Sequence, residues 1–152
     1  MNASPTPPAP PQDPAVGVDV VHVPRLARAL TEQPALADVL FTESERTRAA
    51  ASAAPVAALA LCFAAQEALL KALGTGLSGE GPDARLQQVA LEGGRGGTGA
   101  VEAHLTLDGR VAERVARGGW SAPQVALTRT GEYALATVLL WPRGLLSAGR
   151  GG

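Results

Sequence analysis

The chain has 152 residues and a formal net charge of −1, and 46% of its residues are hydrophobic, enough for one domain with a substantial core. Aromatic residues make up only 3% of the chain, so alanine, leucine and valine must build most of that core. The near-neutral charge, without a basic stripe, argues against a nucleic-acid-binding protein. The single cysteine, Cys62, excludes an internal disulfide and a CxxC metal site.

Both ends of the chain have the composition of loose segments. Residues 1–14 hold six prolines and almost no large apolar side chains, which predicts a disordered tail. Residues 142–152 are expected to be flexible as well, which leaves 15–141 as the domain. The sequence shows no signal-peptide pattern and no apolar run of about 18 residues. We therefore expect a cytoplasmic protein that binds neither a membrane nor nucleic acid.

The domain begins with a segment rich in β-branched residues. Residues 16–23 read VGVDVVHV, which predicts a largely buried strand. Asp19 interrupts this apolar run, and a buried carboxylate needs a partner. An outward-facing position on a half-exposed strand is one explanation for it, and a functional site is another.

Helical segments follow the first strand. A short helix is expected over 25–33, and a second helical stretch over 35–51 is broken near Phe41. Thr42 and Glu45 have the spacing of a capping box, so a new helix is predicted to begin there. We expect the Glu43 and Glu45 carboxylates to be solvated at this helix start, where they favour the helix dipole.

The longest predicted element is a helix from Pro55 to Leu73. Proline is tolerated in the first turn of a helix, and Gly74 is a natural stop after its last turn. The segment between them is apolar on several faces, which is typical of a helix at the centre of a fold.

The remainder of the domain is predicted to form two hairpins with a helix between them. The expected elements are strands 85–92 and 100–107 around a Gly-rich turn, an amphipathic helix over 109–118, and strands 123–130 and 132–141 around a turn near Gly131. The order of these elements predicts an α+β fold in which an antiparallel sheet packs around one long helix.

Two charged side chains stand out in the long apolar helix. Glu67 and Lys71 are four residues apart, so they share one helix face. A surface ion pair worth about 0.3–0.5 kcal/mol is one explanation. A second is a magnesium–phosphate site that includes Asp19 and the Gly-Thr-Gly turn at 74–76. Magnesium takes one or two protein carboxylates and completes its octahedron with water and substrate phosphates, and glycine lets backbone N–H groups approach phosphates.

The sequence resembles the holo-acyl-carrier-protein synthase type of 4′-phosphopantetheinyl transferase. The resemblance rests on GVDVVHVPRLARAL, LFTESE, FAAQEALLKALGTGL and VALTRTGEYALATVLL, which occur in the family order and cover nearly all of 15–141. It implies the fold of that family and the transfer of the phosphopantetheine arm of coenzyme A to a serine of an apo acyl carrier protein. It also implies a homotrimer with coenzyme A bound at the subunit interfaces.

The resemblance further implies roles for individual residues. Asp19 and Glu67 would hold Mg²⁺, and Lys71 would stabilise the phosphates and protonate the leaving group. Arg25 matches a basic position that contacts the acidic carrier protein. The positions that fall on the family's coenzyme A-binding surface are Cys62, Gln66, Gly74, Thr75, Gly76 and Arg129.

Four positions depart from the family pattern. Gln66 stands where the family has lysine, Cys62 where it has arginine, Ala126 where it has serine, and Arg129 where it has histidine. Loss of a lysine and an arginine from a phosphate-binding surface removes contacts worth about 1.5–3 kcal/mol each. Arg129 offsets part of this loss, because arginine can bind a phosphate bidentately.

These departures leave alternatives to a working transferase. The fold can be put to other work on a carrier-bound acyl or polyketide chain, as a lyase, dehydratase or cyclase, with Asp19, Glu67 and Lys71 in acid–base roles. A carrier-protein binder without catalysis is a third reading. Cys62 is expected to be a buried packing residue and no nucleophile. His22 and His104 are not expected to bind a metal.

Overall fold

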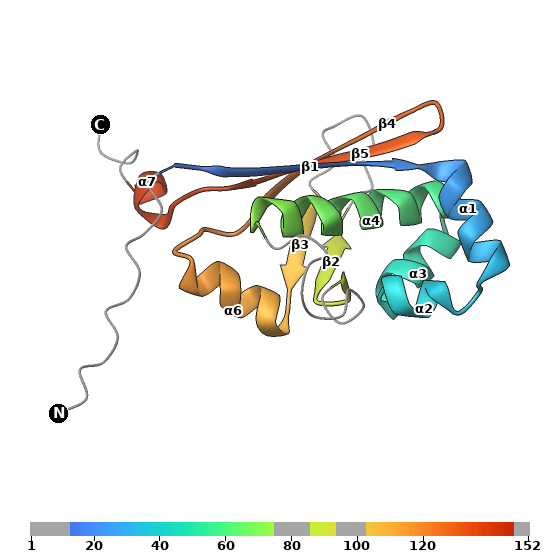
Figure 1. Ribbon diagram of the computed structural model, residues 1–152, viewed down its shortest axis with the longest axis horizontal. Coiled ribbons are helices and arrows are strands. Elements are labelled where there is room, and N and C mark those ends of the chain that lie inside the picture. The colour runs from blue at the N-terminus through green and yellow to red at the C-terminus, as the bar shows by residue number, and fades with distance from the viewer. Residues whose placement is uncertain (1–12, 75–85, 94–102, 148–152) are drawn as a thin grey trace.

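The computed structural model describes residues 13–74, 86–93 and 103–147. The strands are β1 (Ala15–His22), β2 (Val89–Glu92), β3 (His104–Leu107), β4 (Gln124–Thr130) and β5 (Tyr133–Leu140). They form one antiparallel sheet of five strands in the order β1-β5-β4-β3-β2. Figure 1 shows β1, β5 and β4 together along one side of the long helix α4, whereas β3 and β2 turn downward behind it. The predicted α+β fold with an antiparallel sheet on one long helix is thereby confirmed.

The helices follow the predicted pattern closely. They are α1 (Val23–Glu32), α2 (Leu36–Leu40), α3 (Glu43–Ala50), α4 (Pro55–Ala72), α6 (Gly109–Arg117) and α7 (Arg143–Ser147). The predicted break falls between α2 and α3, and the predicted capping box is present, since Thr42 and Glu45 each bond the other's backbone N–H. Gly74 adopts φ 68° after the end of α4, a conformation that glycine reaches without strain.

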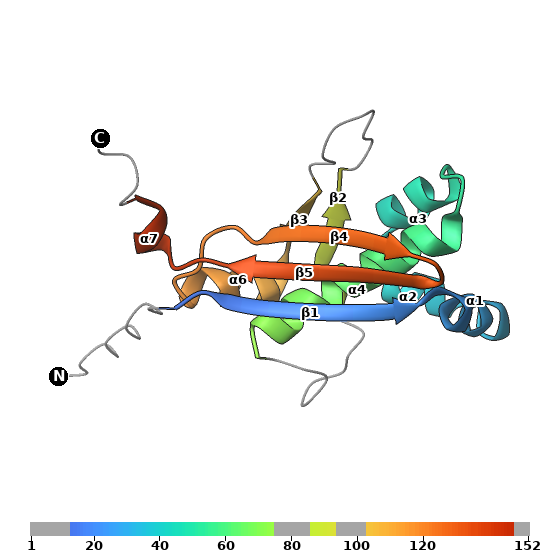
Figure 2. The ribbon, with the colours of Figure 1, turned by 90° about the horizontal axis from the view of Figure 1, so that it is seen from above.

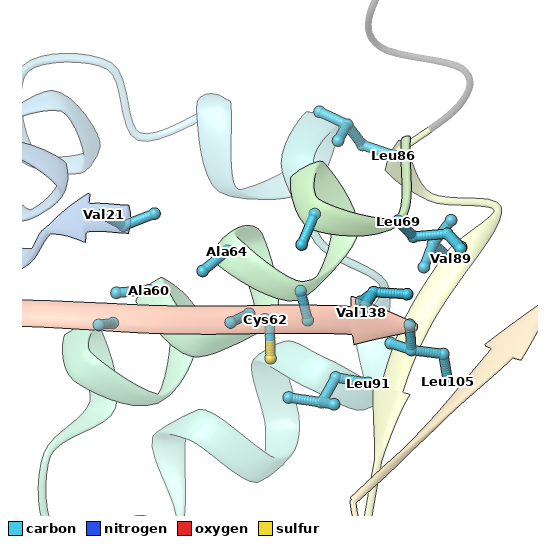
Figure 3. Packing of buried hydrophobic residues seen from close by; sticks show 14 of the residues in the cluster. Val21, Ala60, Cys62, Ala64, Leu69, Leu86, Val89, Leu91, Leu105 and Val138 are labelled. Carbon is cyan, nitrogen blue, oxygen red and sulfur yellow. The ribbon is translucent and has the colours of Figure 1, made fainter. Parts of the chain in front are cut away.

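The central helix α4 packs on the sheet through small side chains. Its buried residues include Ala60, Ala64 and Ala68, which have no exposed surface, so the helix backbone can approach the strands. Figure 3 shows the larger side chains, such as Leu69 and Val138, filling the space beside this contact. By length and composition α4 also qualifies as a membrane span, but half of it is buried within the fold, as in the core helix of a folded domain.

Gly17 allows the closest contact between β1 and α4. A Cβ atom at this position would lie 1.8 Å from the backbone oxygen of Ala68 and 2.7 Å from the backbone nitrogen of Ala72. Only a residue without a side chain fits here. The glycine of the Gly-x-Asp segment thus fixes the distance between the strand that carries Asp19 and the helix that carries the other charged residues.

The prediction of a largely buried first strand is wrong. Val16, Val18 and Val20 are 54%, 49% and 52% exposed, because β1 turns them to the face of the sheet opposite α4. Figure 2 looks onto β1, β5 and β4 from this side, and none of the labelled helices lies over them. Asp19 and Val21 occupy the other face. The strand is therefore half-exposed, and Asp19 points inward.

The C-terminal boundary of the domain also differs from the prediction. Pro142 is buried and forms an isolated bridge with Trp120, and Arg143 to Ser147 form the short helix α7. The ordered fold therefore continues past 141. Residues 1–12 and 148–152, which contain most of both predicted tails, lie outside the described residues.

Candidate functional site

Asp19 and Lys71 meet where β1 crosses the last turn of α4. The Nζ atom of Lys71 lies 2.5 Å from Oδ1 of Asp19 and also donates to the backbone oxygen of Val18 at 3.3 Å. The Asp19 side chain is 14% exposed and that of Lys71 is 50% exposed. The carboxylate is therefore held in the fold, whereas the lysine reaches it from the solvent side.

Glu67 completes the group one helical turn before Lys71. Its Oε1 atom is buried and has no hydrogen-bond partner among the described residues. Burial raises the pKa of the Glu67 carboxyl above 4.5, the nearby Asp19 carboxylate raises it further, and Lys71 lowers it. A buried, unpartnered carboxylate oxygen is costly, and such atoms gather at functional sites.

The two carboxylates of this group fit a divalent cation. Asp19 and Glu67 supply two carboxylates on adjacent elements, and the orphaned Glu67 oxygen is available as a ligand. Oxygen ligands of this kind suit Mg²⁺, which needs only one or two protein carboxylates when substrate phosphates complete its shell. The described residues contain no group of three or more His, Cys, Asp or Glu side chains that could hold a metal, so an all-protein metal cage is not built here.

Gln66 lies away from this group, although it is adjacent to Glu67 in sequence. Its side chain is fully buried, and Nε2 donates to both carboxylate oxygens of Glu45 at 3.3 and 3.2 Å. The predicted contact with coenzyme A is therefore not available to Gln66 in this conformation. The amide instead joins α4 to α3 inside the protein.

The structure corrects the prediction for Glu45, which is 1% exposed and not solvated. Its Oε1 accepts from the backbone N–H of Leu91 at 2.9 Å, and its Oε2 accepts from the backbone N–H of Thr42 at 3.0 Å. With the Gln66 amide, these donors satisfy both carboxylate oxygens. The capping-box spacing gave the signal for the local contact with Thr42, but the contact with β2 is invisible in the sequence.

Cys62 is buried beside the contact between Glu45 on α3 and Gln66 on α4, which we call the α3–α4 junction. Figure 3 shows its sulfur directed towards the side of the core where Leu91 lies. Burial raises the pKa of the Cys62 thiol to about 12, the Glu45 carboxylate raises it as well, and Arg48 lowers it. A thiol with so high a pKa is unreactive at neutral pH, in agreement with a packing residue and not with an exposed cofactor contact.

The remaining predicted residues lie on the surface. Arg25 is exposed in the first turn of α1, and Arg129 is exposed near the end of β4. Within the described parts of the chain, neither arginine forms an ion pair with Asp19 or Glu67. Ala126 is exposed on the face of β4 opposite α4. Thr75 and Gly76 lie outside the described residues, so only Gly74 of the predicted turn is placed, directly after α4.

Two carboxylates and one ammonium at the edge of an α+β domain are typical of enzymes that transfer phosphate-linked groups. Comparison of the sequence with known proteins identifies the family within this class of enzymes. The sequence profile of the 4′-phosphopantetheinyl transferase superfamily matches residues 15–138. The chain is 38% identical over 125 residues to a holo-[acyl-carrier-protein] synthase of Salinispora arenicola, covering 82% of this chain and 95% of that protein. A Streptomyces coelicolor holo-[acyl-carrier-protein] synthase is 40% identical over 124 residues, with coverages of 82% and 94%.

Solved structures agree with the sequence comparison. The Chronobacterium ammoniagenes ACPS-CoA complex matches with a TM-score of 0.69 at 28% identity, over 85% of this chain and 97% of that chain. The holo-[acyl-carrier-protein] synthase of Neisseria meningitidis matches with a TM-score of 0.70 at 23% identity, covering 84% and 97% of the two chains. The chain belongs to the 4′-phosphopantetheinyl transferase superfamily and, within it, to the transferases of the holo-acyl-carrier-protein synthase type.

Proposed function

We propose that this protein transfers 4′-phosphopantetheine from coenzyme A to a serine of an apo acyl carrier protein, with Mg²⁺ held by Asp19 and Glu67. The observation that carries the proposal is the meeting of Asp19, Glu67 and Lys71 at one point, with one Glu67 oxygen buried and unpartnered. Relatives of this chain are named for the reaction, and one matching structure is a complex with CoA.

The reaction joins the carrier serine to the β-phosphorus of coenzyme A. A bond forms between the serine oxygen and that phosphorus, and the bond from the phosphorus to its bridging oxygen breaks. Adenosine 3′,5′-bisphosphate leaves with the electron pair, and the serine proton passes to water. When bound, Mg²⁺ supplies positive charge that neutralises the pyrophosphate.

Three features of the chain serve this reaction. Lys71, at the half-exposed end of α4, contacts the phosphate oxygens and gives a proton to the leaving group. Asp19 and Glu67 are the residues that would hold the cation. Arg25 is exposed on α1, on the surface where we place the acidic carrier protein. Like Arg129, it forms no ion pair within the described chain that would compete with a contact to the carrier.

The outer face of the sheet supports a homotrimer. The residues of β1, β5 and β4 that share this face include no Asp, Glu, Lys or Arg. They are Val16, Val18, Val20, His22, Tyr133, Leu135, Thr137, Leu139, Gln124, Ala126, Thr128 and Thr130. Among the described residues nothing covers this uncharged face, and Val16, Val18, Val20 and Tyr133 on it are exposed large hydrophobic side chains. Exposed apolar patches mark interaction surfaces, and we assign this one to further copies of this chain.

The trimer can be tested by light scattering coupled to size-exclusion chromatography. Wild-type protein should elute with the mass of three chains, and Val18→Glu should reduce it to one chain, because the new carboxylate would be buried in the interface. Glu43→Lys, at an exposed position on α3, is the control and should remain trimeric. A wild-type monomer at micromolar concentration would overturn the assignment.

The buried positions of Cys62 and Gln66 weaken the case for a repurposed enzyme. Both departures from the family pattern lie inside the α3–α4 junction, so they do not by themselves change the chemistry of an exposed pocket. The departures that remain at the surface are Ala126 and Arg129 on β4. We therefore favour the transfer reaction over acid–base chemistry on a carrier-bound chain.

The proposal is tested by the intact mass of carrier proteins. Purified protein is incubated with coenzyme A, Mg²⁺ and several apo acyl carrier proteins, with each carrier's Ser→Ala variant as control. Addition of one phosphopantetheine arm to the wild-type carrier alone is the expected result, and chelation with EDTA should abolish it. No mass gain on any carrier would contradict the transfer reaction, whereas a gain that persists in EDTA would contradict only its dependence on a cation.

A further inference from the structure

Lys71 is the only lysine in the chain, because the other twelve of the 13 lysine and arginine residues are arginine. This single ammonium group lies at the candidate site and not on the general surface. Arginine and lysine differ in a way that matters here, since an ammonium is a compact charge on a flexible stem and can exchange one partner for another.

The Lys71 ammonium is already engaged. It contacts Oδ1 of Asp19 at 2.5 Å and the backbone oxygen of Val18 at 3.3 Å, so two of its three protons point to β1. A lysine held in this way cannot at the same time direct those protons to a phosphate. While both contacts hold, only the third proton is left for a phosphate, so a full engagement of the ammonium with the phosphates requires a change of partner.

The two carboxylates of the site are unequally neutralised. Lys71 pairs directly with Asp19, whereas Glu67 keeps a buried oxygen without a partner among the described residues. One ammonium facing two carboxylates leaves an excess negative charge at the site. A divalent cation supplies what is missing, but it also repels the ammonium that already sits on Asp19.

The exposures of the two partners decide which one moves. The Asp19 side chain is 14% exposed and fixed by β1, while the Lys71 side chain is 50% exposed. Lys71 can therefore turn outward into solvent more readily than Asp19, which is held in the fold.

We propose that Lys71 is an exchangeable counter-ion: it neutralises Asp19 in the cation-free protein and leaves Asp19 when a divalent cation binds. The released ammonium is then free to bind the anion that enters next. On the proposed function, on which this step rests, that anion is the pyrophosphate of coenzyme A. The consequence is an order of binding, with the cation before the nucleotide.

The single lysine makes the exchange directly visible. Protein grown with ¹³C,¹⁵N-lysine gives one Cε–Hε signal and one Nζ signal, and both report only on Lys71. On titration with Mg²⁺ and no nucleotide, these signals should move to the positions of a solvated lysine. In Asp19→Asn, where the ion pair is absent from the start, they should begin near those positions and change little.

Calorimetry on the same samples separates the outcomes. If Mg²⁺ binds and the lysine signals stay in place, the exchange is wrong while the cation site stands. If Mg²⁺ does not bind without nucleotide, the exchange and the order of binding are wrong, whereas the cation dependence of the proposed function is decided separately by the EDTA control, because substrate phosphates would complete the Mg²⁺ shell. If transfer activity requires Mg²⁺ but the lysine signals never move, only the exchange fails.

A pair of variants tests the competition by affinity. Lys71→Met keeps most of the length of the side chain and removes its charge, so Mg²⁺ should bind about two- to fivefold more tightly, as expected from loss of a partly exposed ion pair. Lys71→Arg keeps the competing charge and should bind Mg²⁺ about as the wild type does. Unchanged or weaker binding by Lys71→Met would overturn the proposal.

Discussion

Two carboxylates lie on different sides of the same central helix, and their surroundings are opposite. Glu45 is buried against α4, and both of its oxygens accept hydrogen bonds, from Leu91, Thr42 and Gln66. Glu67, on α4 itself, keeps one buried oxygen without a partner in the described chain, and burial raises its pKa. The Glu45 carboxylate is fully hydrogen-bonded by donors of the protein, whereas the Glu67 carboxylate keeps an oxygen that a ligand can use.

The comparison teaches how to separate structural from functional charge in this fold. A carboxylate that is fully satisfied stabilises the native state, and its removal exposes unpaired donors. A carboxylate left unsatisfied is held in place by the rest of the protein at a cost in stability. Substitutions at the α3–α4 junction around Glu45 should therefore lower stability. Substitutions at the Asp19–Glu67–Lys71 site should lower activity.

The largest effect is expected from Asp19→Asn. This substitution keeps the shape of the side chain but removes the charge that pairs with Lys71 and that we propose holds the cation. The transfer rate should fall about a hundredfold or more, while the melting temperature stays near that of the wild type, because the ion pair with Lys71 is partly exposed. Initial rates and thermal melts of the same preparation check both halves, and a large loss of stability would contradict the division between the two regions.

Gly17→Ala tests whether the site depends on the close approach of β1 to α4. The added Cβ would overlap the backbone oxygen of Ala68 at 1.8 Å, and neither backbone can move without disturbing the core. We expect a loss of about 3 kcal/mol in the free energy of unfolding, measured by urea denaturation. Gly144→Ala, whose Cβ meets nothing within 4 Å, is the matched control and should change stability by less than about 0.5 kcal/mol.

Glu45→Gln disrupts the hydrogen bonds of the α3–α4 junction without changing the size of the side chain. A glutamine has one acceptor oxygen, so its amide group must face a donor from Thr42, Leu91 or Gln66. The free energy of unfolding should fall by about 1–3 kcal/mol, with the transfer rate per folded molecule close to the wild-type rate. Glu43→Gln, at the exposed start of the same helix, serves as control, and equal destabilisation by both would show that the buried contacts contribute nothing.

The smallest functional effect is expected at Cys62. Since burial raises the pKa of the Cys62 thiol from 9.0 to about 12, far less thiolate is present at neutral pH than for a free thiol. The native protein should resist alkylation that the unfolded protein undergoes readily, and Cys62→Ala should keep the transfer rate within about twofold. Rapid labelling of native protein, counted by mass at this single cysteine, would contradict the buried position.

Some of the site could be predicted because its signals are local. The four-residue spacing places Glu67 and Lys71 on one helix face, and the Gly-x-Asp strand supplies a third charge that the structure brings to them. The position of Gln66 could not be predicted in this way. The helix is apolar on several faces, so the sequence does not show which side meets α3 and which meets β1.

The predictions of a buried first strand and of a solvated Glu45 failed for the same physical reason: neither local pattern shows what packs against the segment. Val16, Val18 and Val20 predict a buried strand because β-branched residues favour both a core and an interface between chains. One chain alone leaves these valines exposed. The burial of Glu45 depends on Leu91, which lies 46 residues further along the chain. A short-range motif such as the capping box shows where a helix begins, but not what is packed over it.

The central claim is that Glu67 serves the reaction and Glu45 serves the fold. The most direct measurement compares Glu67→Gln and Glu45→Gln in one assay, the rate of phosphopantetheine transfer to an apo carrier protein, normalised to the amount of folded enzyme. We predict that Glu67→Gln loses about a hundredfold or more and that Glu45→Gln remains within about threefold of the wild type. Full activity of Glu67→Gln, or a comparable loss in folded Glu45→Gln, would contradict the account.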